Sequence, residues 1–141
     1  YVHCIGDFER ISDYACNLCD SARELQQKNM QFSPKAETEL DILSSAVREA
    51  VDISFDAFKS NNKNEADKVE PLEELIDTLA VELKARHIRR LREGKCTIEL
   101  GFAHSDILNN LERVADHCSN IAVDVIQSDQ LELMHMNILT E

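Results

Sequence analysis

The sequence predicts an all-α fold, an antiparallel bundle of about four long helices. Apolar residues recur at steps of three and four along most of the chain, which is the spacing of one helix face. Only 3 glycines and 2 prolines occur in 141 residues. No stretch alternates polar and apolar side chains as a half-buried strand would, so we expect no sheet.

The first two helices are predicted at about 1–30 and 34–60. The first has an apolar stripe made of Cys4, Phe8, Ile11, Ala15, Leu18, Ala22 and Leu25. Ser33 followed by Pro34 is typical of a helix start, because Ser caps the first turn and Pro is tolerated at the first helical position. An Asn-rich segment at 61–64 ends the second helix.

The third helix is predicted from about residue 64 to 93, where Gly94 ends it. Pro71 falls inside this segment and predicts either a kink or a later start. Arginines occupy its last turns, where cations complement the negative end of the helix dipole: Arg86, Arg89, Arg90 and Arg92.

The fourth helix is predicted from near Thr97 to about Gln127, with an apolar stripe in the same frame as that of the first helix. Ser128 is expected to cap a short final helix over 129–139. The short connection between the third and fourth helices predicts an antiparallel hairpin.

A polar motif occurs in both the first and the fourth predicted helix. The two copies read Glu9-Arg10-Ile11-Ser12-Asp13 and Glu112-Arg113-Val114-Ala115-Asp116, followed four residues later by Asn17 and Asn120. The identical positions are polar, so a shared core pattern does not explain them. An internal repeat of this kind usually marks a supersecondary unit that occurs twice.

The net charge of the chain limits the classes of partner that we expect it to bind. Lys and Arg total 15 against 27 Asp and Glu, a net charge of −12, so nucleic acid and anionic lipid are not expected partners. No apolar run reaches the roughly 20 residues that cross a bilayer, so we expect no membrane insertion of this segment. No nucleophile–base pair, phosphate loop or dinucleotide fingerprint occurs, which argues against an enzyme.

The acidic residues of the motif predict a cation site. Glu112 and Asp116 are one turn apart on one helix flank, as are Glu73 and Asp77 on the third helix. Folding the hairpin between Gly94 and Lys95 brings Asp77 level with Glu112 and Glu73 level with Asp116. Four converging carboxylates repel one another without a counter-charge, and such oxygen ligands suit Mg, Ca, Mn or iron.

Two alternatives remain open for these acids. A solvated acidic face is common in a chain with 27 acidic residues. The same folding of the first hairpin brings Asp52 and Asp56 level with Asp13 and Glu9, so this test yields two candidate clusters and is not very selective. Arg10 and Arg113 are alternative partners for these carboxylates, because guanidinium groups clamp carboxylate or phosphate.

The two Glu-Arg-x-x-Asp motifs resemble the signature of the PhoU family, whose fold consists of two tandem three-helix bundles. By this resemblance, 1–30 is the last helix of a truncated first repeat, 34–127 is a complete second repeat, and 128–141 is a C-terminal tail. Asp67-Lys-Val-Glu70-Pro-Leu-Glu73-Glu-Leu-Ile-Asp77 resembles the motif of the family's middle helix. Ser12 stands where many members carry Gly.

The segment from Lys95 through Gly101, with the second motif, looks like one branch of that family. It is similar to the cytoplasmic PhoU-like domain of bacterial sodium-dependent phosphate cotransporters. The resemblance implies a non-catalytic regulatory domain on the cytoplasmic side of the cell membrane. Its implied partner is the transmembrane phosphate-transport portion of the same protein, with a second copy of the chain as a further candidate.

The resemblance also implies bound metal. Family members hold iron or zinc clusters through paired acidic motifs, which implies the ligands Glu73, Asp77, Glu112 and Asp116, together with Glu9 and Asp13 in an incomplete second site. The missing partner of that second site would then lie upstream or on another molecule. A soluble PhoU regulator of an ABC phosphate transporter, and a structural helical module without metal, are the competing hypotheses.

Overall fold

The computed structural model describes residues 2–140 and, from Cys4 onward, their side chains. This part of the chain forms four long helices and one short one, and it contains no strand. The elements are α1 (Val2–Gln27), α2 (Pro34–Ser60), α3 (Lys63–Ala66), α4 (Val69–Arg92) and α5 (Ile98–Thr140). The predicted all-α fold class is therefore confirmed.

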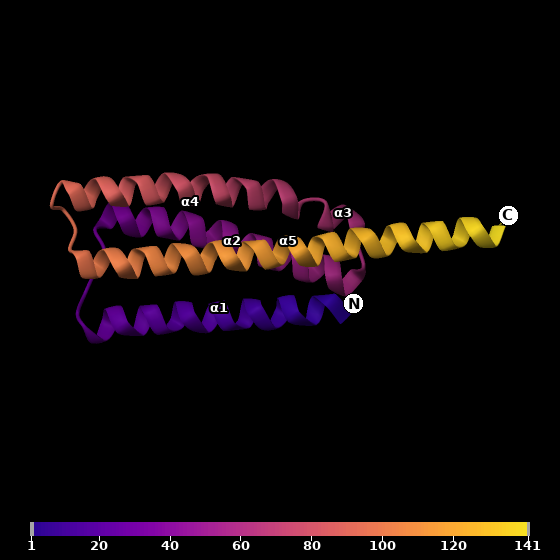
Figure 1. Cartoon of the computed structure of the whole chain (residues 1–141), viewed down its shortest axis with the longest axis horizontal. Helices are drawn as coiled ribbons and strands as arrows, with labels where there is room; N and C mark the ends of the chain where they lie inside the picture. The colour runs from indigo at the N-terminus through magenta and orange to yellow at the C-terminus, as the bar shows by residue number, and fades with distance from the viewer. Residues whose placement is uncertain (1, 141) are drawn as a thin grey trace.

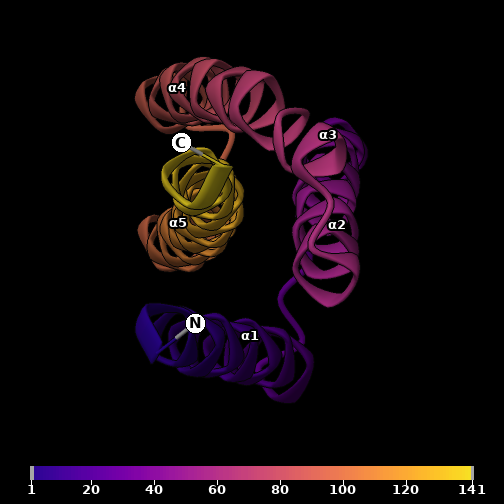
Figure 2. The same cartoon turned by 90° about the vertical axis from the view of Figure 1, so that its right-hand side faces the viewer.

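Helix α5 lies at the centre of the bundle. It packs against α1, α2 and α4, and the end-on view shows these three helices arranged around it (Figure 2). Helices α1 and α4 run antiparallel to α5, and α2 runs parallel to it (Figure 1). No Cα atom of α1 lies within 8 Å of one in α2, so α1 is held mainly by α5.

The helix starts follow the local capping chemistry. The Ser33 hydroxyl accepts the Ala36 N–H at 3.2 Å, as the Ser-Pro start of α2 predicts. The Asn62 side chain caps α3 by accepting the Glu65 N–H at 3.3 Å. Pro71 lies in the first turn of α4, where a helix has no acceptor for an N–H, so α4 starts late instead of kinking.

The core is aliphatic and continuous along the bundle. Its fully buried side chains include Leu43, Val69, Ile76, Leu83, Leu108, Cys118, Ile121 and Val125. Between α1 and α2 the gap is filled by aromatic rings, with Phe8 packed edge-on against Phe55 and Phe58 at centroid distances of 4.9 and 5.0 Å. These rings join the two helices although their backbones stay apart.

Helix α4 approaches α5 closely at one glycine. A Cβ placed on Gly101 would lie 3.0 Å from Nε2 of His87, which is tighter than normal packing allows. Gly101 therefore permits the buried His87 ring to stack on His104, with 4.3 Å between ring centroids.

The expected break at Ser128 is absent. Helix α5 continues without interruption to Thr140, because no Gly or Pro follows Gly101 to end it. Its last turns extend beyond the bundle (Figure 1). The apolar side chains exposed there include Leu131, Met134, Ile138 and Leu139. Among the described helices, none combines the length and apolar character that a bilayer span requires.

Candidate metal centre

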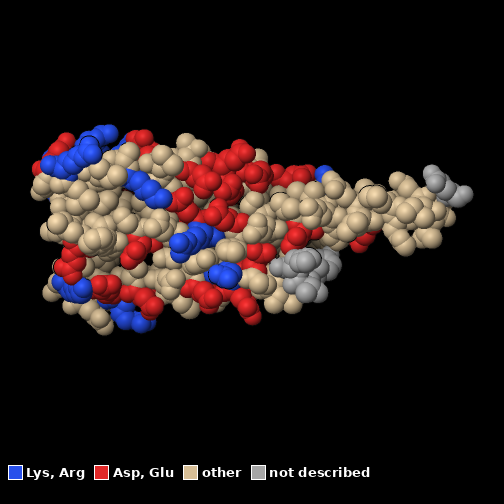
Figure 3. Space-filling model, in the orientation of Figure 1, with Lys and Arg blue, Asp and Glu red and all other residues tan. Residues whose placement is uncertain are grey.

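Three carboxylates from two helices converge on the surface of the bundle. Glu73 and Asp77 lie one turn apart on α4, and Asp116 faces them from α5. Each can offer an oxygen, and these oxygens lie within 4.8 Å of one another. One turn further along, the Ser119 hydroxyl donates to Glu70 Oε2 at 2.8 Å, which shows the same antiparallel register. Figure 3 shows acidic side chains gathered on this face of the molecule.

The electrostatics of this group are unfavourable without a cation. Partial desolvation, together with the nearby Asp77 and Asp116 carboxyls, raises the pKa of Glu73 to about 8. Desolvation and the negative charges of Asp77 and Glu112 also raise the pKa of Asp116. The metal-free cluster therefore holds a proton at neutral pH, and a multivalent cation would remove the need for it.

Glu112, the predicted fourth carboxylate, is paired elsewhere. The structure brings Glu73 level with Asp116 as the folded hairpin predicts, yet Glu112 accepts a hydrogen bond from Lys84 at 2.6 Å. Lys84 follows Asp77 by two helical turns, so it lies on the same side of α4. This heptad spacing is the sequence signal for a Lys84–Glu112 pair, because it places the lysine on the helix side that faces α5.

The second predicted cluster does not form within the described residues. Glu9, Asp13, Asp52 and Asp56 are all exposed, and no grouping of three candidate ligands includes them. The hairpin test assumed that α1 and α2 pack side by side, whereas α1 packs on α5. The described structure therefore gives no support to Asp52 and Asp56 as the partners of Glu9 and Asp13, while a partner from outside the described residues stays untested.

The two motif arginines do not form a common clamp in this structure. The Arg113 guanidinium lies over the Tyr14 ring, 5.7 Å from its centroid, and both Arg10 and Arg113 are exposed. Arg10 has no ion-pair partner in the part of the chain that the structure describes. Neither guanidinium contacts the carboxylate group of Glu73, Asp77 and Asp116.

Polar contacts between α1 and α5 were missed at the sequence level. Asp7 Oδ1 lies 2.7 Å from His117 Nδ1 and accepts the Asn120 side-chain amide at 3.1 Å. The Tyr14 ring stacks on His117 with centroids 5.6 Å apart. The Asn of the first motif copy also links the two helices, since the Asn17 side-chain amide donates to Asn110 Oδ1 at 3.2 Å. The Asn at the same offset in both copies was the available sequence signal for these contacts.

Two comparisons with known proteins point the same way. A family model described as the PhoU domain matches residues 40–125. The Phosphate-specific transport system accessory protein PhoU homolog 1 of Thermotoga maritima is 29% identical over 121 residues. That alignment covers 86% of this chain and 51% of the relative, so the chain spans about half of that relative's length. No solved structure gives a significant match.

The matched segment contains the carboxylate group and the second Glu-Arg-x-x-Asp motif, while the first motif lies outside it. The match extends over more than half of the chain, and the helical bundle agrees with it. These observations together show that the chain belongs to the PhoU family.

Proposed function

We propose that this chain is a non-catalytic regulatory domain accessory to phosphate transport, acting at the cytoplasmic side of the cell membrane. Membership of the PhoU family supports the proposal, as does the relative whose name describes an accessory protein of a phosphate-specific transport system. The most direct partner is then a membrane-bound phosphate transporter of the ABC type, with its signalling proteins. This choice favours the soluble regulator over our first expectation of a cotransporter domain.

The function rests on a cation held by Glu73, Asp77 and Asp116. The observation that carries this step is their convergence from α4 and α5, which places one oxygen of each within 4.8 Å of the others. The raised pKa of Glu73, caused by desolvation and the neighbouring carboxyls, agrees with this reading. An all-oxygen donor set suits Mg, Ca or Mn, and the family resemblance adds iron and zinc. A bound ion would neutralise part of the acidic face, which lets an anionic partner approach it.

Metal content tests this site directly. We expect protein purified without chelator to carry metal, and an Asp77→Asn/Asp116→Asn variant to lose most of it by elemental analysis. Asp52→Asn/Asp56→Asn is the matched control, since it also removes two negative charges, here from an exposed pair on α2 outside the cluster. Equal metal content in all three proteins would leave the acidic face as a merely solvated surface.

The regulatory role is tested in cells. Replacing the parent gene by the Asp77→Asn/Asp116→Asn variant is expected to change phosphate uptake and the output of a phosphate-starvation reporter, relative to the control variant. Uptake and reporter output that match those of the unmodified strain under both phosphate-rich and phosphate-poor growth would contradict the proposal.

A sodium–phosphate cotransporter domain is the second candidate. The segment from Lys95 through Gly101 favours it, because it resembles that branch of the family. The sequence encoded upstream of Tyr1 separates the two: membrane-spanning helices support the cotransporter, and further bundle helices alone support the soluble regulator.

A further inference from the structure

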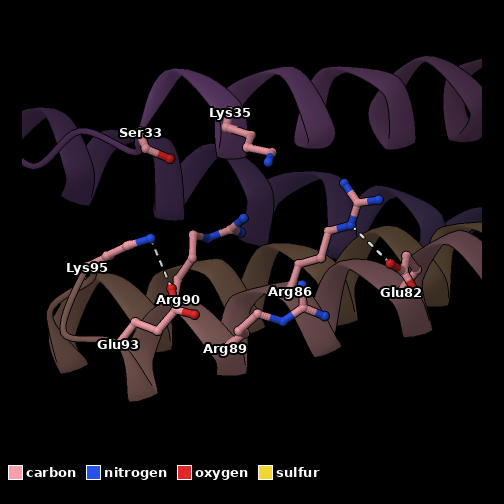
Figure 4. Close-up of a pocket in the computed structure, with 8 residues that line it drawn as sticks. All are labelled: Ser33, Lys35, Glu82, Arg86, Arg89, Arg90, Glu93 and Lys95. Atoms are coloured by element: carbon pink, nitrogen blue, oxygen red, sulfur yellow. Dashed lines mark hydrogen bonds and ion pairs between the residues drawn. The ribbon is translucent and has the colours of Figure 1, made fainter.

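A basic pocket lies at the end of the bundle where α2 begins and α4 ends. Its volume is about 570 Å³, within the range of small-molecule sites. The lining residues come from the start of α2, the last turns of α4 and the following loop: Ser33, Lys35, Glu82, Arg86, Arg89, Arg90, Glu93 and Lys95. Figure 4 shows Arg86 and Arg90 extending from α4 towards α2, and Lys35 extending from α2 into the space between them.

The pocket carries a surplus of positive charge in a chain whose net charge is −12. Three of its five cations are matched by carboxylates. Arg86 Nε donates to Glu82 at 3.0 Å, Lys95 lies 3.0 Å from Glu93, and Arg90 donates to the buried Glu39 at 3.0 Å.

Lys35 and Arg89 are the two cations left over. Both are exposed, and neither has an ion-pair partner within the described residues. The surplus of two positive charges corresponds to the charge of one phosphoryl dianion.

The chemistry of these groups suits a phosphate ligand. Guanidinium groups offer planar pairs of N–H donors that match phosphate oxygens. Arg90 also has a solvent-inaccessible Nη2 without a hydrogen-bond partner in the described structure. The pocket includes the N-terminal end of α2, a 27-residue helix whose dipole favours negative charge there.

We propose that this pocket binds a small organic phosphate, with its phosphoryl group held between Lys35 and Arg89 and supported by Arg86. The pocket is far larger than an inorganic phosphate ion needs, and it shares Ser33, Arg90 and Lys95 with a neighbouring cavity of about 20 Å³. The space that the phosphoryl group does not fill is available to the organic part of the ligand.

Helix-dipole compensation alone does not explain the arrangement. Arginines in the last turn of α4 stabilise its negative end. Lys35, however, belongs to another helix, and Arg86 lies a turn earlier on α4 than that last turn. The pocket also lies at the opposite end of α4 from Glu73 and Asp77, so it is a site separate from the carboxylate cluster.

Calorimetric titration of the full chain with AMP, ADP and inorganic phosphate tests the proposal. The Lys35→Gln/Arg89→Gln variant removes the unpaired charge and leaves the buried Arg90–Glu39 pair intact. Arg48→Gln/Lys59→Gln is the matched control, because it neutralises two exposed cations of α2 outside the pocket. Each titration is done both before and after chelator treatment, so that phosphate held by metal at the carboxylate cluster is recognised.

We expect AMP or ADP to bind more tightly than inorganic phosphate, and the pocket variant to weaken that binding by about tenfold or more. The control variant should retain the parent affinity. Absence of binding by every probe up to about 1 mM, or equal weakening in the control, would overturn the proposal. Binding that disappears with chelator would also overturn it, whereas loss of metal from the carboxylate cluster would bear only on the proposed function.

Discussion

The ammonium group of Lys84 lies 2.6 Å from a carboxylate oxygen of Glu112, and this ion pair joins α4 to α5 beside the carboxylate cluster. Glu112 is one turn from Asp116, so it could otherwise join Glu73 and Asp77. The lysine thus acts as an internal competitor of any metal ion. Its removal would offer a fourth carboxylate to the cluster.

Lys84→Gln is expected to increase metal affinity. The substitution frees Glu112 and removes a positive charge near the site, and a partly exposed ion pair of this kind is worth about 1 kcal/mol or less. The expected gain is therefore about fivefold in the Kd for Mn²⁺, measured by calorimetry. Lys59→Gln, which removes an exposed cation from α2, is the control, and an unchanged Kd for Lys84→Gln would show that Glu112 is not a ligand.

Metal binding is expected to release a proton and to strengthen as pH rises. The pKa of Glu73 is raised to about 8 by partial desolvation and by Asp77, so its carboxyl is largely protonated at neutral pH. A metal ion must displace that proton. Titrations in buffers of different ionisation enthalpy will show the release, and its persistence in Glu73→Gln would contradict the assignment.

The metal-free protein should lose stability as pH rises through about 8. Glu73 has a higher pKa folded than its ordinary value of 4.5, so the folded state binds more protons than the unfolded state between these values. Urea unfolding in the presence of chelator, at about pH 6 and about pH 9, measures this loss. The Glu73→Gln variant should show a smaller difference between the two pH values.

Acid should destabilise the bundle through His104. Burial, together with the positive charge of a protonated His87 and of Arg90, lowers the pKa of His104 to about 4, so the unfolded chain takes up a proton first as pH falls below 6.5. The stability lost between about pH 6.5 and pH 4 is at most about 3 kcal/mol. Above about pH 4.5, protonation of Glu73 increases the stability of the folded state as pH falls, so it opposes the effect of His104.

The comparison between parent and His104→Leu separates these effects. The variant lacks the titrating imidazole and keeps the carboxylate cluster, so its stability should fall less on acidification. Unfolding by urea at several pH values provides the measurement. Parallel pH profiles for the two proteins would show that His104 does not titrate differently on folding.

Alanine at the two helical glycines should give opposite results. At Gly6 a Cβ meets nothing within 4 Å, so Gly6→Ala is expected to stabilise the protein by about 0.5–1 kcal/mol through helix propensity. At Gly101 the Cβ would lie 3.0 Å from the buried His87 ring, so overpacking should outweigh that gain and cost about 1–2 kcal/mol net. Urea midpoints of the two variants provide the measurement, and stabilisation by Gly101→Ala would contradict the close packing.

Local chemistry explains why much of the fold was predictable. The start of α2 at Pro34 and the late start of α4 depend on capping and on the missing proline N–H, which act within one turn. The end of α5 was missed because Ser128 is compatible with the interior of a helix as well as with a cap. Such a choice depends on the following residues, none of which is Gly or Pro.

The pairing of Glu73 with Asp116 was also predictable, since a short connection fixes the register of a two-helix hairpin. The hairpin rule failed for α1 and α2. Their connection is similarly short, yet α1 packs on α5, and Phe8 fills the space against α2. Spacing along the chain restricts which helices can meet, whereas the available apolar surface decides which do.

The sequence by itself determined the helices and the repeated polar motif. It also determined which acidic residues of α4 lie opposite those of α5, because each of these features follows from helical periodicity or from a short turn. Only the tertiary structure decided which carboxylates converge, since the long Lys84 side chain reaches Glu112 and leaves three acids together. It also assembled the basic pocket, whose cations come from α2, α4 and the following loop. Such sites depend on how far side chains reach across packed helices, and the periodicity of a single helix does not predict that reach.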